Sequence, residues 1–562
     1  MRKYYSEEFE PKNWEIIEKE LIILQKYEIN SEEDFFIFLE KLSEIGFIIG
    51  EYSAWKYIKM TCNADNPEYT VDFNEYYENV LSKTETYFFE LDKKIYNSKY
   101  FNELGSRYEV MKMSIKNNIS LFREENIPLS VKENELTTKY SELSSKLTVN
   151  FKGEEQTLVS MRKYLKDIDR STREEAWNLI YNRLLTSESE FNSIFNELVK
   201  LREQISKNAD FTNYRDYMHI SKGRFDYSVS DIYEFHNSVK EIVVPFLKEL
   251  NNEKREKLGV EILRPWDTDV DVDGIILKPF ENSNELLDKM IEILSEINID
   301  YGKQLERMKN EKLIDLDNRK GKANGGYNYP LEETGAAFIF MNSIGMHSDM
   351  VTLAHEAGHA IHSFYTSKLK LAWDRRFPSE VAELASMSME LITMEYWYKY
   401  YSDPKLLKKA KIEQLEDTLK ILPWVMVVDK FQHWIYTNKN HSIEERYSAF
   451  EKIIDEYNVG VNWDGYDSYK KIAWFRQLHI FEVPFYYIEY AISQLGAIAI
   501  YKNYKENKDN SIKNYSNFLE KGYSLPIKKL YELAGIKFDF SKDYIKELVD
   551  FIKEELNYEK QN

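Results

Sequence analysis

The stretch TLAHEAGHAIHS (residues 352–363) carries two histidines four residues apart, with a glutamate directly after the first. Residues four apart lie on one face of a helix, so His355 and His359 can both direct an imidazole at one metal ion. Glu356 then lies beside the ion without having to bind it. Only 9 of the 562 residues are histidines, and chance rarely produces this spacing from so few. The stretch therefore predicts a zinc-hydrolase helix.

The residues around the histidine pair favour a buried helix. Asp349 precedes the first turn, where a carboxylate interacts favourably with the helix dipole. Gly358 costs about 1 kcal/mol in a helix interior relative to alanine, which indicates that another backbone or the substrate approaches closely there. The small and apolar side chains of this stretch are Val351, Leu353, Ala354, Ala357, Ala360 and Ile361.

A catalytic zinc ion needs a third protein ligand and keeps an open position for water. His347 and His362 lie near the pair in the sequence and are possible ligands. We expect His347 ahead of the helix, so that only a loop could bring it in, and His362 a turn beyond the pair. A second helix is the more usual source of the third ligand.

The segment FPSEVAELASMSMELITMEYW (377–397) is predicted to be that second helix, because its Pro-Ser pair suits a helix start. Its acids Glu380, Glu383 and Glu390 share one face and are flanked by small or apolar residues. One carboxylate can bind the metal, and another can accept the second N–H of a ligating imidazole. The spacing alone leaves open which glutamate is the ligand.

A third stretch, WFRQLHIFEVPFYYIEYAISQLGA (474–497), offers hydrogen-bond donors. Acyl-transfer chemistry needs donors where the oxyanion develops, and His479, Tyr486, Tyr487 and Tyr490 suit that role. The alternative interpretation is a helix that buries its aromatic residues. The segment DVDVDGIILKPF (269–280) begins like a calcium-binding loop, but a phenylalanine stands where the bidentate glutamate belongs, so we interpret it as a polar loop.

The composition excludes several classes of function. A net charge of -20 disfavours binding to nucleic-acid phosphates and to anionic membranes. Cys62 is the single cysteine, so the chain can form neither an internal disulfide nor a cysteine zinc cage. The N-terminal sequence shows no apolar signal segment, and no run approaches the ~18 apolar residues of a membrane helix. We expect a cytoplasmic protein with no nucleic-acid and no membrane partner.

Helical periodicity recurs along nearly the whole chain, while glycine (19) and proline (12) are sparse, which predicts a mostly α protein. The apolar run at residues 337–341 is the best strand candidate and ends shortly before the histidine helix. Residues before about 190 have the pattern of helical hairpins and no chemical motif. We therefore expect an N-terminal helical, lid-like region at residues 1–190 and a catalytic domain at residues 191–562.

Together these motifs resemble the mostly helical zinc oligopeptidases that include oligoendopeptidase F, Pz-peptidase and thimet oligopeptidase. The resemblance is closest to the oligoendopeptidase F branch. It spans roughly residues 260–500, and helical character extends it across the chain. The motifs that carry it are TLAHEAGHAIHS (352–363), FPSEVAELASMSMEL (377–391), GKANGGY (321–327), Arg264-Pro265-Trp266-Asp267 and PFYYIEYAISQLGA (484–497).

The resemblance implies one zinc ion per chain, held by His355, His359 and Glu383. The family pattern Glu-x-x-Ser-x-x-x-Glu matches Glu383, Ser386 and Glu390, and its first glutamate is the ligand. The resemblance implies that the Glu390 carboxylate accepts the second N–H of a metal-binding imidazole.

The family's carbonyl-binding histidine and tyrosine carry over to His479 and Tyr490, with Tyr486 as a weaker match. The sequence departs from the thimet branch at residues 480–484, which replace a glycine-tyrosine loop and shift the spacing. Both tyrosines therefore stay candidates for oxyanion binding. Glu356 would take a proton from a zinc-activated water and deliver it to the leaving amine.

The implied fold is an α-helical ellipsoid that encloses a deep channel, with a zincin-like core and zinc on the channel floor. The run AAFIFMN (336–342) would offer a strand edge to an extended peptide. The implied function is zinc-dependent endopeptidase activity, the hydrolysis of internal peptide bonds in short unfolded oligopeptides.

Two alternative functions stay open. A helical zinc carboxypeptidase would need a cationic pocket for the substrate carboxylate, and Arg375, Arg376 and Arg476 are possible donors. A peptide-binding protein with structural zinc is a different class. It fits less well, because a structural site usually closes with a fourth ligand.

Overall fold

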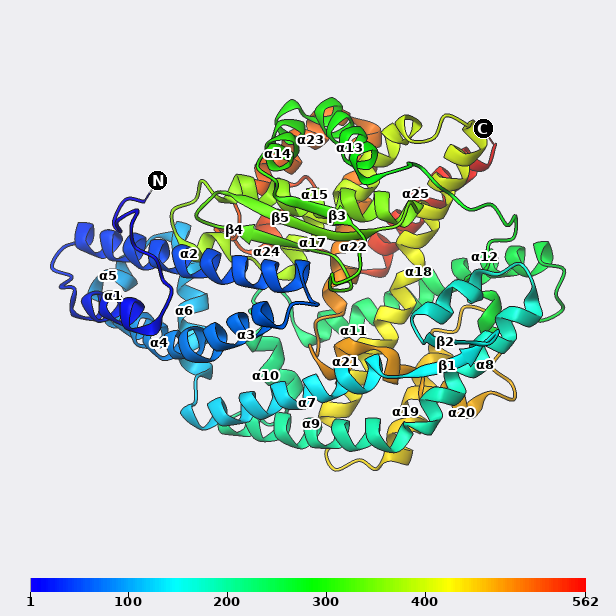
Figure 1. The fold of residues 1–562 in the computed structure, drawn as a ribbon, viewed down its shortest axis with the longest axis horizontal. Helices are drawn as coiled ribbons and strands as arrows, with labels where there is room; N and C mark the ends of the chain where they lie inside the picture. The colour runs from blue at the N-terminus through cyan, green and yellow to red at the C-terminus, as the bar shows by residue number, and fades with distance from the viewer. Residues whose placement is uncertain (1, 562) are drawn as a thin grey trace.

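The computed structural model describes residues 2–561, and most of these residues are helical (Figure 1). The mostly α fold predicted from helical periodicity is confirmed. The described strands form two small sheets. Within residues 2–561, no helix is long and apolar enough to cross a membrane.

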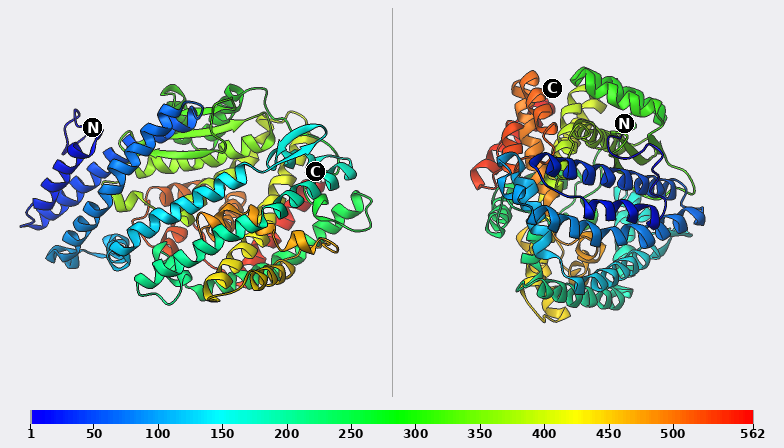
Figure 2. Two further views of the ribbon diagram at one scale, coloured as in Figure 1. Left: turned by 60° about the horizontal axis from the view of Figure 1, so that its bottom comes forward. Right: turned by 90° about the vertical axis from the view of Figure 1, so that its left-hand side faces the viewer.

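The first helices form a group of their own toward the left of Figure 1, and this group projects from one end of the molecule in Figure 2. Their apolar faces enclose a separate small core that includes Phe35, Phe38, Leu91 and Phe101. The helices of this group are α1 (Trp14–Lys26), α2 (Glu32–Cys62), α3 (Pro67–Tyr76), α4 (Ser82–Asn97), α5 (Lys99–Glu103) and α6 (Glu109–Leu121).

The remaining helices enclose a much larger core, in which α17 packs against both α15 and α22. These helices are α7 (Ile127–Ser145), α8 (Arg170–Thr186), α9 (Glu188–Asn208), α10 (Tyr214–Ser221), α11 (Val229–Ser238), α12 (Val244–Lys257), α13 (Ser283–Ile297), α14 (Ile299–Asn310), α15 (His347–Thr366), α16 (Ala372–Arg375), α17 (Ser379–Thr393), α18 (Pro404–Thr437), α19 (Ile443–Glu456), α20 (Asp467–Lys470), α21 (Leu478–Phe481), α22 (Ile488–Glu506), α23 (Lys508–Leu519), α24 (Ile527–Leu533) and α25 (Lys542–Gln561).

The larger sheet has the strand order β3-β5-β4. The predicted strand is present as β5 (Ala336–Ser343), parallel to β3 (Ile314–Asp317) and antiparallel to β4 (Tyr327–Leu331). The expectation that β5 offers a free edge to a peptide is wrong, because both of its neighbours pair with it. Its first six residues are buried, as suits a central strand. The edge strand beside α15 is β4, whose Asn328 amide donates to the Glu356 carbonyl at 3.2 Å.

A β-hairpin interrupts the N-terminal part of the chain, where the sequence pattern predicts only helices. β1 (Thr148–Phe151) pairs antiparallel with β2 (Glu154–Thr157). The turn residues Lys152 and Gly153 have φ values of 53° and 84°. Consecutive positive φ angles give the backbone twist that two-residue hairpins prefer. Four-residue strands are too short to produce a recognisable alternation of polar and apolar residues.

The helix of the histidine pair begins earlier than expected. His347 is the first residue of α15, and it does not lie in a preceding loop. The Asp349 carboxylate accepts hydrogen bonds from the backbone N–H groups of Ile344 (2.8 Å) and Met346 (2.9 Å). Asp349 thus lies within the first turn of α15 and not ahead of it as predicted, because the helix begins at His347.

The two helices that carry the histidines and the acidic stripe touch at a glycine. α17 begins at Ser379, directly after Pro378, as predicted. A Cβ atom on Gly358 would stand 2.7 Å from the Cα of Ser386 and 2.9 Å from the carbonyl oxygen of Ala385. The predicted close approach at Gly358 is therefore that of the α17 backbone.

The Arg264-Pro265-Trp266-Asp267 stretch is linked to α8 by ion pairs of Asp267. The buried Asp267 carboxylate pairs with Arg170 at 2.7 Å and with Arg173 at 2.8 Å. Burial alone would raise the pKa of Asp267, but the hydrogen bonds from the two arginines outweigh it and hold the pKa below its usual value. The motif has a structural role in this chain.

Candidate metal centre and active site

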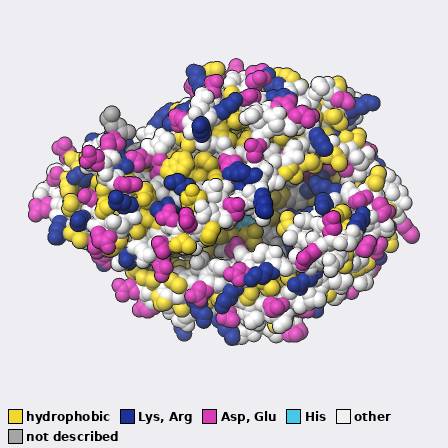
Figure 3. Space-filling view, in the orientation of Figure 1, with side chains coloured by type: hydrophobic (Ala, Val, Ile, Leu, Met, Phe, Trp, Pro, Cys, Tyr) yellow, Lys and Arg dark blue, Asp and Glu magenta, His cyan; other side chains and the backbone are white. Residues whose placement is uncertain are grey.

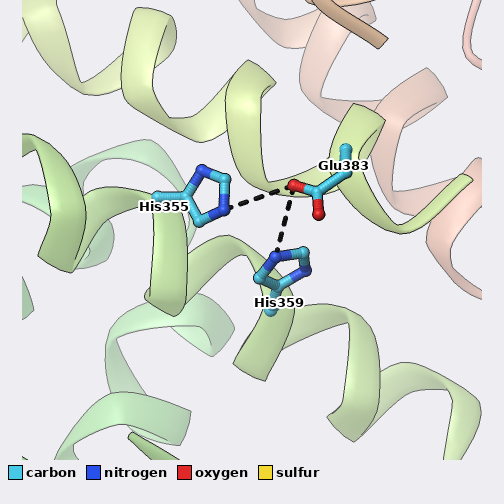
Figure 4. A group of neighbouring side chains, drawn as sticks. All are labelled: His355, His359 and Glu383. Carbon is cyan, nitrogen blue, oxygen red and sulfur yellow. Dashed lines mark ion pairs between the residues drawn. The ribbon is translucent and has the colours of Figure 1, made fainter. Parts of the chain in front are cut away.

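His355, His359 and Glu383 converge between α15 and α17 (Figure 4). The Oε2 atom of Glu383 lies 3.3 Å from the Nε2 atom of His355 and 3.6 Å from the Nε2 atom of His359. Over residues 2–561, this is the only group of three His, Cys, Asp or Glu side chains close enough to share one metal ion. The structure thus brings together the three residues that the sequence nominates as ligands.

The donor set suits a zinc ion. Zinc binds histidine nitrogen and carboxylate oxygen at about 2.0–2.2 Å in tetrahedral geometry. Two such ligand atoms are therefore separated by about 3.4 Å, which matches the distances from Glu383 to the two histidines. Two imidazoles and one carboxylate also leave a fourth position for water, as in catalytic zinc sites.

Residues behind the group fix its orientation. The Nδ1 atom of His355 lies 2.7 Å from Oε1 of Glu390, so the imidazole can present Nε2 to a metal. The other carboxylate oxygen of Glu390 accepts from Gln414 of α18 at 3.2 Å. The Ser386 hydroxyl donates to Oε2 of Glu383 at 3.0 Å.

The pKa values of the group reflect hydrogen bonds among its own members. Burial alone would lower the pKa of His355, but hydrogen bonds to Glu383 and Glu390 raise it well above its usual value. Burial alone would raise the pKa of Glu383, yet hydrogen bonds from His355 and His359 hold it well below its usual value. The Glu383 carboxylate is therefore negatively charged at neutral pH and available as a ligand.

Glu356 lies beside the ligands and is buried, with 6% of its surface exposed. Its Oε2 atom has no hydrogen-bond partner among residues 2–561. Burial raises the pKa of Glu356, while the positive charges of His355 and His359 oppose that rise. A buried carboxylate with an unpartnered oxygen and a raised pKa is suited to accept and return a proton.

The other residues considered as ligands lie elsewhere. The Nδ1 atom of His347 lies 2.9 Å from the Tyr401 hydroxyl. His362 is fully buried, and its ring stacks on Phe377 at a centroid distance of 4.1 Å. Glu380 is also buried and accepts a hydrogen bond from the Tyr227 hydroxyl.

His479 and the tyrosines form an aromatic cluster. The ring of His479 lies 4.6 Å from Tyr487, 6.0 Å from Tyr486 and 6.1 Å from Tyr490. All four side chains are half-buried, and a loop separates α21 from α22. The alternative of a helix that buries its aromatic residues holds for other aromatics of the segment, such as Trp474 and Phe481, but these four side chains stay partly exposed.

The charge of Glu383 acts on both candidate tyrosines. Burial raises the pKa of Tyr490, and the charges of Tyr486 and Glu383 act in the same direction. Burial also raises the pKa of Tyr486, again with a contribution from Glu383. Each hydroxyl therefore keeps its proton near neutral pH and can donate a hydrogen bond.

A hydrogen-bond relay sets the protonation of His479. The indole N–H of Trp424 can only donate, and it lies 2.8 Å from Oε1 of Gln477. The amide nitrogen of Gln477 then faces Nδ1 of His479 at 2.7 Å and donates to it. Burial, followed by the charge of Lys222, lowers the pKa of His479 to about 4. The ring is therefore neutral near pH 7, and its proton lies on Nε2.

The sequence of residues 163–550 matches the model of peptidase family M3. The chain belongs to peptidase family M3. This membership confirms the resemblance inferred from the sequence motifs, and it implies a metal ion.

Curated relatives share parts of this M3 sequence. An oligoendopeptidase F homolog from Borreliella burgdorferi is 28% identical over 379 residues, which cover 64% of this chain and 61% of that protein. The oligopeptidase PepF from Bacillus subtilis is 26% identical over 254 residues, which cover 45% of this chain and 38% of that protein. The chain thus spans less than two thirds of the length of these relatives.

Solved structures of the same fold cover nearly the whole chain. A structure of Pz peptidase A with an inhibitor superposes with a TM-score of 0.90 at 25% identity, and covers 99% of each chain. Oligoendopeptidase F from Enterococcus faecium has a TM-score of 0.65 at 18% identity, and covers 97% of each chain.

Sequence reasoning missed the residues that anchor the His479 loop in this M3 chain. Arg224 donates to the carbonyl oxygen of Phe485 and pairs with Glu489 at 2.7 Å. The side chain of Gln432 accepts from the Phe485 amide at 2.8 Å. These contacts hold Phe485 at a φ of 62°, which costs a non-glycine residue about 1–2 kcal/mol.

Arg202 of α9 anchors the preceding turn. It is fully buried and donates to the carbonyl oxygens of Ile480 and Phe481. It also pairs with Glu133 of α7 at 2.6 Å. No sequence signal identifies Arg202, because its partners lie far away along the chain.

Proposed function

We propose that this chain is a zinc-dependent endopeptidase that hydrolyses internal peptide bonds of short unfolded oligopeptides. One observation carries the proposal: the ligand atoms of His355, His359 and Glu383 meet at one point, and the buried Glu356 carboxylate stands beside them. The names of the curated relatives, oligoendopeptidase and oligopeptidase, agree with this substrate class.

The three ligands would hold one Zn²⁺ ion per chain, and Glu390 would orient His355 from behind. When bound, zinc supplies Lewis acidity that makes water more acidic and polarises a peptide carbonyl. Glu356 takes the proton of the attacking water and later delivers it to the leaving amine.

His479 and a tyrosine stabilise the developing oxyanion in this proposal. The neutral His479 ring donates from Nε2, and the Tyr490 or Tyr486 hydroxyl donates a second hydrogen bond. One preorganised donor of this kind is typically worth about 3 kcal/mol in the transition state. The Trp424–Gln477 relay supports the role of His479, because it leaves the Nε2 proton available.

The shape of the molecule supports extended peptides as substrates. A hollow crosses the middle of the face in Figure 3, and lysine and arginine side chains gather along its margins. The edge of β4 lies beside α15 through the Asn328–Glu356 contact, so a peptide in the hollow can add to that edge. The lid-like role of residues 1–190 stays a prediction; the separate small core belongs to α1–α6, whereas α7 and α8 pack into the larger core.

The carboxypeptidase alternative loses two of its proposed cationic donors. Arg375 is engaged by three backbone carbonyls, those of Leu369, Glu332 and Ser367. Arg376 lies against Gly46 of α2, in the N-terminal helix group. A structural-zinc protein is disfavoured because the part of the chain that the structure describes offers three ligands to the metal group and not four.

The test compares wild-type protein with Glu356→Gln. Metal content is measured by atomic spectroscopy, and cleavage of an internally quenched peptide ladder is measured by mass spectrometry. We expect about one zinc ion in both proteins and cleavage by wild type alone. Turnover at the wild-type rate in Glu356→Gln would contradict the assignment of the base. A C-terminally amidated peptide that resists cleavage would favour a carboxypeptidase.

A further inference from the structure

A second cavity lies apart from the metal group. It has a volume of about 380 Å³ and opens between α8, α18, α19 and the loop that follows α19. None of the metal-binding candidates lines it. Its walls are rich in aromatic rings, which include Trp177, Tyr181, Trp424 and Trp463. A cavity of this size and lining is typical of sites that enclose a small ligand or part of one.

Two arginines line this cavity without a paired carboxylate; Arg162 is exposed and Arg476 is half-buried. Arg162 and Arg476 form no side-chain hydrogen bond and no ion pair with any of residues 2–561. Arg476 instead lies over the Tyr181 ring, 5.8 Å from its centroid. Arg173 and Arg224, which are fully buried, each pair with a carboxylate.

The other charges of the cavity do not neutralise this pair. Lys420 also lines it but is paired with Glu416 at 2.9 Å and Asp417 at 3.1 Å. Asp269 is the carboxylate in the lining, and it forms no ion pair with either arginine. Partial burial lowers the pKa of Arg162 and the charge of Arg476 lowers it further, while the charge of Asp269 opposes this shift without reversing it. The two guanidinium groups thus repel each other, and an anion between them would relieve that repulsion.

The cavity shares a wall with the candidate active site. The Trp424 ring lines the cavity, and its N–H is bound to Gln477, which in turn contacts His479. Arg476 directly precedes Gln477 in the chain. A peptide held at the metal group therefore has a cationic pocket within the same structural unit, on the far side of the His479 relay.

We infer that Arg162 and Arg476 form a subsite for a carboxylate of the peptide substrate, with the aromatic walls packing against the residue that carries it. Guanidinium groups bind carboxylates through paired, charge-assisted hydrogen bonds, and aromatic faces accept a neighbouring side chain. The carboxylate is either the C-terminus of the peptide or an acidic side chain. The inference rests on the proposed peptidase function.

The two sources of the carboxylate predict different patterns. A C-terminal carboxylate anchored in the cavity would fix the distance between the cleaved bond and the end of the peptide. Peptides of different length would then be cut at a constant number of residues from the C-terminus. An acidic side chain in the cavity would instead fix the cut relative to that side chain, whatever the peptide length.

The experiment uses matched peptides: a free acid, its C-terminal amide, and amides with one Glu or Gln moved along the sequence. We expect kcat/KM to be about tenfold higher for the peptide with the correctly placed carboxylate, in keeping with one or two charged hydrogen bonds. Arg162→Gln with Arg476→Gln should remove that preference. Lysine at both positions should restore part of it. The exposed neighbour Lys163→Gln is the matched control and should keep the preference.

Binding to the inactive Glu356→Gln protein gives a second readout by calorimetry. The carboxylate peptide should bind about tenfold more tightly than its neutral counterpart, and the double arginine variant should bind both equally. The subsite would be overturned if the proteins that keep both arginines showed equal kcat/KM and equal affinity for all the peptides. A carboxylate preference that survives the double substitution would also overturn it. If wild type cleaves no peptide at all, the proposed function fails, and the calorimetric comparison still decides the subsite.

Discussion

Gly358 of α15 faces Ser386 of α17 so closely that a methyl group on the glycine would stand 2.7 Å from the serine Cα. This contact brings Glu383 of α17 to the two histidines of α15. A hydrogen atom is the only side chain that fits between the helices there. Glycine lowers the stability of α15, but only glycine lets α17 approach closely enough to complete the metal group.

Gly358→Ala should push the two helices apart. Overpacking of this kind costs roughly 1–3 kcal/mol of stability, and the separation of Glu383 from the histidines should also lower zinc affinity. Thermal denaturation and competition with a zinc chelator measure the two effects. Gly105→Ala is the control, because no atom of the described residues lies within 4 Å of an added Cβ atom there. Wild-type zinc affinity in Gly358→Ala would refute the contact as the determinant of the site.

Glu390→Gln should weaken metal binding while leaving the ligands intact. The carboxylate accepts from Nδ1 of His355, and losing such support typically costs 10–100-fold in metal affinity or activity. Chelator competition gives the affinity, and added zinc should restore part of the activity. Gln414→Leu, which removes only the outer contact to Glu390, should have a smaller effect. An unchanged affinity in Glu390→Gln would argue against this role.

Replacing each tyrosine by phenylalanine should identify the oxyanion donor. Loss of the donor hydroxyl should reduce kcat by about 10²–10³, with little change in KM. The double variant Tyr486→Phe/Tyr490→Phe should be no worse than the more impaired single variant if one hydroxyl acts alone. Tyr487→Phe provides the comparison, because its ring also contacts His479. Full activity in the double variant would remove both tyrosines from the mechanism.

Gln477→Glu tests the relay to His479. A carboxylate can only accept, so it would take hydrogen bonds from both the Trp424 indole and Nδ1–H of the imidazole. The proton would move from Nε2 to Nδ1, and kcat should fall by about 10² or more through loss of the donor. Nitrogen NMR of the histidine ring reports the tautomer directly. A fall in kcat without a change of tautomer would show that Gln477 acts in another way.

His362 should make the protein sensitive to acid. Burial lowers the pKa of His362 to about 3 from 6.5, so between these values the folded state binds fewer protons than the unfolded state. Stability therefore falls as the pH falls through that window, by up to about 1.4 kcal/mol per pH unit. His362→Phe keeps the stack on Phe377 and removes the titration. Its Tm should decline less than that of wild type between pH 6.5 and 4.5; parallel declines would contradict this.

Local spacing in the sequence predicts the helical fold and the first two metal ligands, His355 and His359. Residues four apart in a helix lie on the same face, so this spacing can be interpreted without the structure. Glu383 could be selected over Glu380 only through the family pattern. The structure shows the two carboxylates in different surroundings, since Glu380 contacts Tyr227 and Glu383 contacts the histidines. Position on a helix face alone cannot distinguish them.

Long-range contacts escape sequence reasoning for a different reason. Gln414 and Gln432 both lie on α18, yet they support the metal group and the Phe485 loop respectively. Their roles depend on which helices pack against α18, and the periodicity of the sequence does not predict helix packing. The same limit explains the error about β5, whose apolar run indicates a buried strand but does not reveal that both of its edges are paired.

Arg202 makes the geometry of the site depend on the width of the hollow. Arg202 belongs to α9, which lies with α7 in the lower part of Figure 1, whereas α15 lies above. Its guanidinium group donates hydrogen bonds to the carbonyl oxygens of Ile480 and Phe481, next to His479. Any motion that carries α9 away from α15 therefore carries His479 away from Glu383. A polypeptide that is too bulky to enter the hollow without moving α9 away from α15 would therefore separate His479 from Glu383 as it entered. Under the proposed function, a folded protein that spread the walls would therefore meet a site whose residues are out of position.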